Sequence, residues 1–154
     1  MKASGSYGTG GKKRNLWLLA AVFLVLLFIW GQSCLPVKDS SRESSWLLEQ
    51  LVNPILHFVG LGDISHTLLR KLAHVSEFAV LSALLACFWR GRPVQTLLSG
   101  FVAATLDESL QLLSDRGARV SDIWIDFIGV AVGTAFGWLV WRLVQRSAAR
   151  KQAR

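Results

Sequence analysis

Four long apolar stretches constrain the fold of this chain more than any other feature of its sequence. They cover residues 16–35, 71–89, 94–113 and 123–141. A helix needs about 20 apolar residues to cross the hydrocarbon core of a bilayer, and each stretch approaches that length. Because the last three are joined by short connections, they are expected to be antiparallel neighbours. The sequence therefore predicts an all-α protein, an integral membrane four-helix bundle.

A polar loop separates the first apolar stretch from the other three. Within it, residues 46–57 have the apolar spacing of a short amphipathic helix, with Trp46 on the apolar face. This helix is too short to cross a bilayer, so we expect it to lie between spans one and two on the outward-facing surface of the membrane that the spans cross. His57, His66 and Asp63 lie near its end, but their spacing matches no metal-binding signature, and we interpret them as surface residues.

The charge distribution predicts how the chain is oriented. Most of its 17 basic residues lie near the N-terminus, at Arg90 and Arg92, or in the C-terminal tail, and none of its 10 acidic residues lies in those places. Such segregation follows the positive-inside rule. We therefore expect a multi-pass protein of the bacterial cytoplasmic (inner) membrane with both termini in the cytoplasm. A nucleic-acid partner, which the net charge of +7 alone would allow, does not explain the alternation.

The predicted organisation has five parts. They are a disordered basic cytoplasmic arm at 1–14, transmembrane helix one at 15–35, an extracytoplasmic loop with the interfacial helix at 36–69, a core of transmembrane helices two to four at 70–142, and a basic cytoplasmic tail at 143–154.

Polar residues gather at the predicted outer ends of spans two, three and four. Ionisable residues inside apolar segments are costly, and they indicate a functional site by default. Span two carries three of them at helical spacing, which places them on one side of that helix. The complete cluster is Lys71, His74, Glu77, Asp107, Glu108, Gln111, Arg116, Asp122 and Asp126.

A glycine stripe continues the line of Asp122 and Asp126 along span four. Gly129, Gly133 and Gly137 repeat every fourth residue, and this small-xxx-small pattern lets helix backbones approach closely. Packing along the stripe would direct the two aspartates into the bundle, away from lipid. The same stripe would also allow an oligomer to form between chains.

Three chemistries suit the polar cluster. The candidates for catalysis are His74, Glu77, Asp107, Glu108, Asp122 and Asp126. His74 beside a carboxylate would make a general acid–base pair. His74 with several carboxylates would hold a divalent cation, but one histidine without cysteine argues against zinc, and we predict neither a metal nor a cofactor. Carboxylates alone would bind a cationic or sugar-bearing ligand. A purely structural role, in which the cluster holds the helices together, is the alternative.

Residues 70–137 resemble the VanZ-like family of small bacterial membrane proteins. The resemblance rests on RKLAHxxEF at 70–78, on DExxQ at 107–111, and on DxxxDxxGxxxG at 122–133. The chain departs from the family pattern at Phe78, where relatives often have Tyr. It departs again in the turn, where Pro-Gly-Arg is absent, so that Arg116 is the better match for the family arginine and Arg119 the fallback.

The resemblance implies a role in the cell envelope. The family's founding member is linked to low-level resistance to teicoplanin, a glycopeptide that acts on cell-wall precursors outside the membrane. We therefore expect an envelope protein whose outward-facing pocket binds or acts on an amphiphilic or lipid-linked ligand among the membrane lipids. One alternative is a membrane-embedded hydrolase or transferase that uses His74 and carboxylates. The other is a structural or interaction protein.

Overall fold

The computed structural model describes residues 9–34, 46, 50, 52–58, 63–114 and 120–152. In that part of the chain all regular structure is helical. The helices are α1 (Thr9–Ser33), α3 (Asn53–Phe58), α4 (His66–Phe88), α5 (Pro93–Leu113) and α6 (Val120–Gln152).

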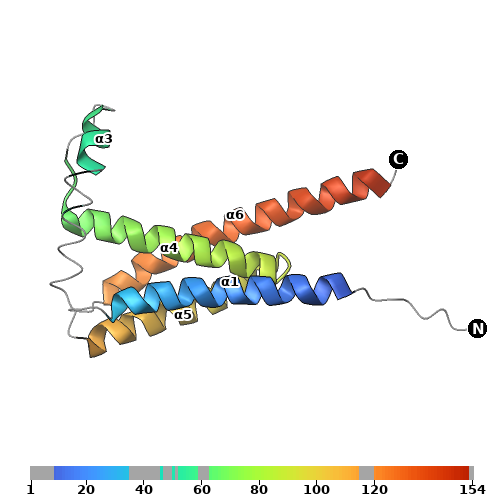
Figure 1. Cartoon of the computed structure of the whole chain (residues 1–154), viewed down its shortest axis with the longest axis horizontal. Coiled ribbons are helices and arrows are strands. Elements are labelled where there is room, and N and C mark those ends of the chain that lie inside the picture. Colours follow the sequence, from blue (N-terminus) through green and yellow to red (C-terminus); the bar gives the residue numbers. More distant parts are fainter. Residues whose placement is uncertain are drawn as a thin grey trace, which may run out of the picture.

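The four long helices pack side by side (Figure 1). The helices α1 and α5 end where α4 and α6 begin, so these four termini lie together at one end of the bundle. We call this the polar end and define it by Ser33, His74, Asp107 and Asp126. The most extensive contact in the bundle is between α4 and α6.

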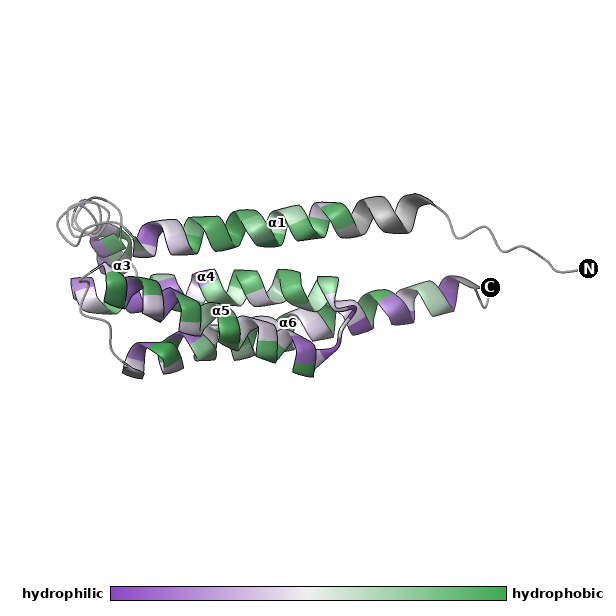
Figure 2. Cartoon of the chain, turned by 90° about the horizontal axis from the view of Figure 1, so that it is seen from below, coloured by the Kyte–Doolittle hydropathy of each residue, from purple (hydrophilic) through white to green (hydrophobic). Residues whose placement is uncertain are grey.

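Three of the helices are long and apolar enough to cross a membrane, namely α1, α4 and α6. Large apolar side chains such as Trp17 and Phe136 are exposed on the outside of the bundle, which is the surface expected where lipid replaces water. Figure 2 shows that α1 is apolar along most of its length. The all-helical, membrane-compatible fold is thus confirmed. The prediction of a fourth span, at α5, is not confirmed, because the acidic and polar residues of α5 lower its hydropathy.

The glycine stripe of α6 lies against the backbone of α4. A Cβ atom placed on Gly129 would meet the carbonyl oxygen of Val75, and one on Gly133 would meet that of Ala79. One turn further, a Cβ on Gly137 would lie 2.6 Å from Cβ of Ala86. The stripe is therefore used within the chain, and it brings the first turns of α4 and α6 together at the polar end.

Several helix boundaries differ from the predicted ones. The predicted arm at 1–14 is helical from Thr9, because lysine and arginine extend a helix readily once an apolar segment has nucleated it. The helix α4 starts at His66 instead of near residue 70, since the Ser65 hydroxyl caps it by accepting a hydrogen bond from the Leu68 amide at 3.2 Å. The helix α6 extends through the predicted tail to Gln152.

Only part of the predicted interfacial helix at 46–57 falls within the described residues, and there α3 forms its C-terminal portion. The side chains of His57 and Asp63 are exposed and lie 2.7 Å apart, Nε2 to Oδ1. His66 is also exposed. These three residues therefore lie on the surface, as their spacing indicated.

Candidate functional site

The imidazole of His74 stands between two carboxylates that come from different helices. Its Nδ1 lies 3.9 Å from Oδ2 of Asp107 on α5 and 3.8 Å from Oδ1 of Asp126 on α6. Both distances exceed hydrogen-bond length. These side chains meet because the glycine stripe holds α6 against α4 one turn away from Asp126. Three residues far apart in the sequence thus form one centre.

The carboxylate of Asp107 is fully buried and held by hydrogen bonds. The hydroxyl of Ser33, at the end of α1, donates to Oδ1 at 2.6 Å. The amide of Gln111, one turn along α5, donates to Oδ2 at 2.8 Å. A further bond ties the helices at this point, from the Ser114 hydroxyl to the Ser33 carbonyl oxygen at 2.8 Å. Asp107 therefore has a fixed orientation, and its Oδ2 faces His74.

Asp126 is placed differently, although it is almost as deeply buried, with 2% of its surface exposed. Among the described residues, no side chain or backbone group makes a hydrogen bond to its carboxylate, and no lysine or arginine pairs with it within 4.0 Å. Among the described residues, its ion-pair contact within that distance is with the His74 ring. A buried carboxylate in such surroundings costs free energy unless another group compensates its charge.

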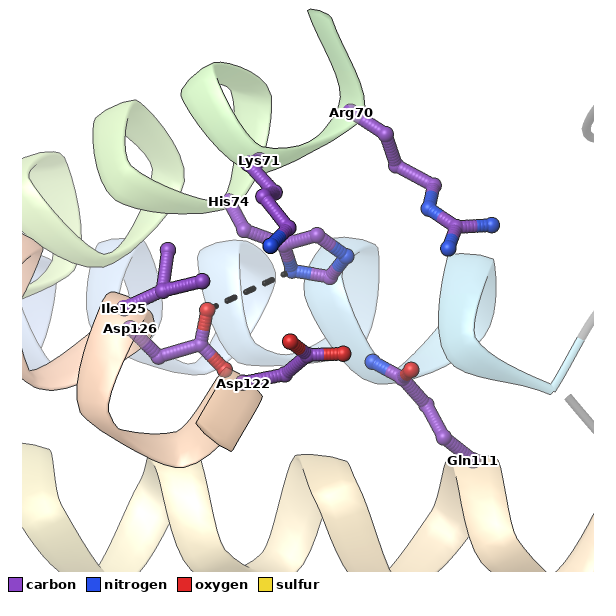
Figure 3. Close-up of a pocket in the computed structure, with 7 residues that line it drawn as sticks. All are labelled: Arg70, Lys71, His74, Gln111, Asp122, Ile125 and Asp126. Atoms are coloured by element: carbon purple, nitrogen blue, oxygen red, sulfur yellow. Dashed lines mark ion pairs between the residues drawn. The ribbon is translucent and has the colours of Figure 1, made fainter. Parts of the chain in front are cut away.

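A small hollow opens beside His74 and Asp126. Its volume is about 20 Å³, enough for one water molecule or one ion. Figure 3 shows side chains from α4, α5 and α6 directed into it, with both basic residues on the α4 side. Its lining consists of Arg70, Lys71, His74, Gln111, Asp122, Ile125 and Asp126.

Two of the predicted carboxylates lie outside the lining of the hollow. Glu77 is half-buried on α4 and does not line the hollow. Glu108 is buried on α5, next to Asp107 in the chain, and does not line it either. Arg116 and Arg119 lie outside the described residues. Of the nine predicted cluster residues, the structure therefore gathers Lys71, His74, Asp107, Gln111, Asp122 and Asp126 around one point.

Two residues of the site were not predicted from the sequence. Ser33 was missed because it follows an apolar run and looks like its end. The spacing of Ser33 could have identified it, because Val22, Ile29 and Ser33 are all buried and fall on one face of α1. Arg70 was read only as part of a motif, yet it lines the hollow beside Lys71.

These features define a helical membrane protein with a polar site at one end of its bundle. The chain belongs to the VanZ/LLP1 family, whose model matches residues 16–145. The match extends well beyond the segment 70–137 that carries the resemblance, and it includes α1. Ser33, the partner of Asp107, therefore lies inside the family region. Comparisons with curated proteins and with solved structures find no match.

Proposed function

We propose that the hollow at the polar end binds the headgroup of an amphiphilic or lipid-linked ligand. The observation that carries this proposal is the lining of the hollow, where two basic residues face two carboxylates at the end of an otherwise apolar bundle. A headgroup that enters from the membrane boundary would reach Arg70 and Lys71 first, while its apolar chain would stay among the exposed apolar side chains. Mixed charges of this kind suit a polar, hydrogen-bonding headgroup.

The proposal includes an orientation in the bacterial cytoplasmic membrane. With four spans and both termini inside, the polar end would face outward. The 21 residues of α5 would reach about 31 Å at 1.5 Å per residue, the thickness of the hydrocarbon core. A phosphatase reporter, active only outside the cytoplasm, is fused after Arg154 and, separately, within the loop at 36–45. Activity at the loop and none at the C-terminus is expected, and the reverse pattern would contradict the orientation.

Direct binding is the principal test. The full-length protein, purified in detergent, is titrated with undecaprenyl diphosphate and followed by native mass spectrometry. A hydrogen bond to a charged group contributes roughly 1.5–3 kcal/mol, so Lys71→Ala should weaken binding about 10- to 100-fold. Arg146→Ala is the matched control, because it removes an exposed basic residue of α6 away from the hollow. Equal affinity of both variants would contradict a headgroup site at Lys71.

The family membership motivates a second test, in cells. Expression of the chain in a glycopeptide-susceptible bacterium should raise the minimal inhibitory concentration of teicoplanin, and His74→Ala should abolish the increase. The control His57→Ala leaves the polar end intact and should retain it. No increase with the unaltered chain, at normal protein level in the membrane, would remove the proposed link to glycopeptides while leaving lipid binding open.

Hydrolase or transferase activity is a second candidate function, and the placement of His74 favours it. Nδ1 faces the two aspartates, and Figure 3 shows the other ring nitrogen turned away from Asp126. A carboxylate that orients an imidazole is the arrangement of a general base. Release of phosphate from undecaprenyl diphosphate by the purified protein, lost in His74→Gln, would support catalysis. Binding without turnover would support the headgroup site alone.

A further inference from the structure

We propose that His74, Asp107 and Asp126 bind one divalent cation of the Mn²⁺ type between α4, α5 and α6. The sequence led us to predict no metal, because one histidine without cysteine argues against zinc. The structure brings one imidazole nitrogen and two carboxylate oxygens within 4.8 Å of one another. The inference does not depend on which organic ligand the hollow receives.

The distances suit a shared ion. Two atoms that each lie about 2.1 Å from one metal are at most about 4.2 Å apart. The separations of His74 Nδ1 from the two aspartates, 3.9 and 3.8 Å, already satisfy this limit. The widest separation in the group is within 4.8 Å, so all three ligand atoms must move inward by several tenths of an ångström to share one ion at this bond length. Side-chain rotation alone provides such a movement.

The charge of Asp126 is the second, independent observation. Its buried carboxylate is directed toward the hollow, and it has no hydrogen bond and no lysine or arginine partner among the described residues. A buried carboxylate takes up a proton, pairs with a cation or coordinates a metal, and among the described residues the ion-pair partner of Asp126 is His74. The nearby Lys71 side chain lines the hollow but makes no ion pair within 4.0 Å with either aspartate in the described structure. A cation at the centre would compensate both carboxylates together.

Asp107 has the support that metal ligands usually have. Ser33 and Gln111 donate hydrogen bonds to its two oxygens at 2.6 and 2.8 Å, and such partners fix the orientation of a ligating carboxylate. The hydroxyl comes from α1, so the first helix contributes to the site without touching the ion. The hollow of about 20 Å³ next to the three ligands provides room for a water or a ligand oxygen in an open coordination position.

The ligand types select the kind of ion. Carboxylate oxygens suit Mg²⁺, Ca²⁺ and Mn²⁺, whereas imidazole suits the heavier first-row transition metals. A set with one nitrogen and two oxygens therefore favours a small divalent cation of the Mn²⁺ type, which lies between these two classes of ion. No cysteine belongs to the group, which argues against ions that prefer sulfur. With three protein ligands, an octahedral ion would keep positions for water or for a phosphate oxygen of a headgroup.

Electron paramagnetic resonance tests this directly with Mn²⁺ as the probe. Full-length protein in detergent is stripped with EDTA, dialysed, and titrated with MnCl₂ while the signal of free Mn²⁺ is measured. We expect saturable binding of one ion per chain. Asp126→Asn and His74→Gln should each weaken it at least 10-fold, whereas His57→Ala and Asp63→Asn, which alter the exposed histidine–aspartate pair, should leave it unchanged.

A second measurement does not depend on variants of the site itself. In pulsed electron paramagnetic resonance experiments, bound Mn²⁺ should show coupling to one imidazole nitrogen in the unaltered protein. The coupling should persist in the double variant His57→Ala/His66→Ala, in which His74 is the remaining histidine. Absence of saturable binding would overturn the proposal. So would loss of the nitrogen coupling in the double variant, or unchanged binding by folded Asp126→Asn protein. Binding of undecaprenyl diphosphate is measured in a separate experiment, so failure of the metal-site proposal can be distinguished from failure of the headgroup proposal.

Discussion

The two halves of the seam between α4 and α6 are built on opposite principles. Away from the polar end, glycines of α6 press against the backbone of α4, and Gly133 leaves no room for a Cβ beside Ala79. At the polar end, the same two helices face each other through His74 and Asp126, whose nearest polar atoms are 3.8 Å apart. One half is closely packed, and the other leaves a hollow.

The difference separates the part that stabilises the bundle from the part that is available for binding. In lipid, helices associate mainly through close van der Waals packing, and interhelical hydrogen bonds average only about 0.6 kcal/mol. The glycine half therefore provides adhesion without ionisable groups. The polar half buries the carboxylates of Asp107, Glu108 and Asp126, which packing alone does not require, and this indicates a role other than adhesion.

The largest expected effect follows from filling the glycine half. Gly133→Val introduces three carbon atoms where a single Cβ would already meet the backbone of Ala79. Backbone atoms cannot rotate aside, so we expect a loss at the upper end of overpacking costs, about 3 kcal/mol or more. The measurement is the yield of monodisperse protein in detergent together with its thermal midpoint.

The matched control for this change is Gly31→Val on α1, where an added Cβ meets nothing within 4 Å. It should leave yield and midpoint nearly unchanged. If Gly133→Val were equally well tolerated, close packing of α6 on α4 would not be what holds the two helices together, and the contrast between the halves would fail.

A smaller effect is expected at Asp107, which is firmly hydrogen-bonded in the polar half. Ser33→Ala removes the hydroxyl that donates to Asp107 at 2.6 Å. A hydrogen bond to a charged group contributes roughly 1.5–3 kcal/mol, so the midpoint should fall by several degrees. Ser76→Ala is the control, because its exposed hydroxyl only donates to the carbonyl of Ala73 in its own helix. An equal response of both variants would show that Asp107 does not tie α1 to α5.

Sequence alone predicted the features that depend on local pattern. Apolar length identified the helices that can cross a membrane, and the four-residue spacing of Gly129, Gly133 and Gly137 predicted a close helix contact. The segment RKLAHxxEF identified the family, which the match over residues 16–145 confirms. The predicted domain limits and site roles remain predictions, although the structure does bring most of the predicted cluster together.

What the sequence could not provide is the distance between residues on different helices. Ser33 and Asp107 are 74 positions apart, and no periodicity within one helix shows that they meet. The same holds for the metal-binding geometry, because His74, Asp107 and Asp126 come from three helices. The fourth span at α5 stays a prediction for a related reason. The residues that build the site also lower the hydropathy of that helix.

The smallest effect distinguishes the two halves by its sign. Asp126→Asn keeps the shape of a buried side chain but removes a carboxyl group that no described hydrogen bond supports. In EDTA, the thermal midpoint should therefore stay the same or rise by about 2–4 °C, as expected for roughly 1 kcal/mol in a chain of this size.

With excess Mn²⁺ the order should reverse, because only the unaltered protein gains stability from an ion bound to its folded state. Asp122→Asn, which changes a half-buried carboxylate outside the three-residue group, should keep the Mn²⁺ response. A marked fall in the midpoint of Asp126→Asn in EDTA would mean that this carboxylate stabilises the bundle as the glycines do, and the two halves would then serve one purpose.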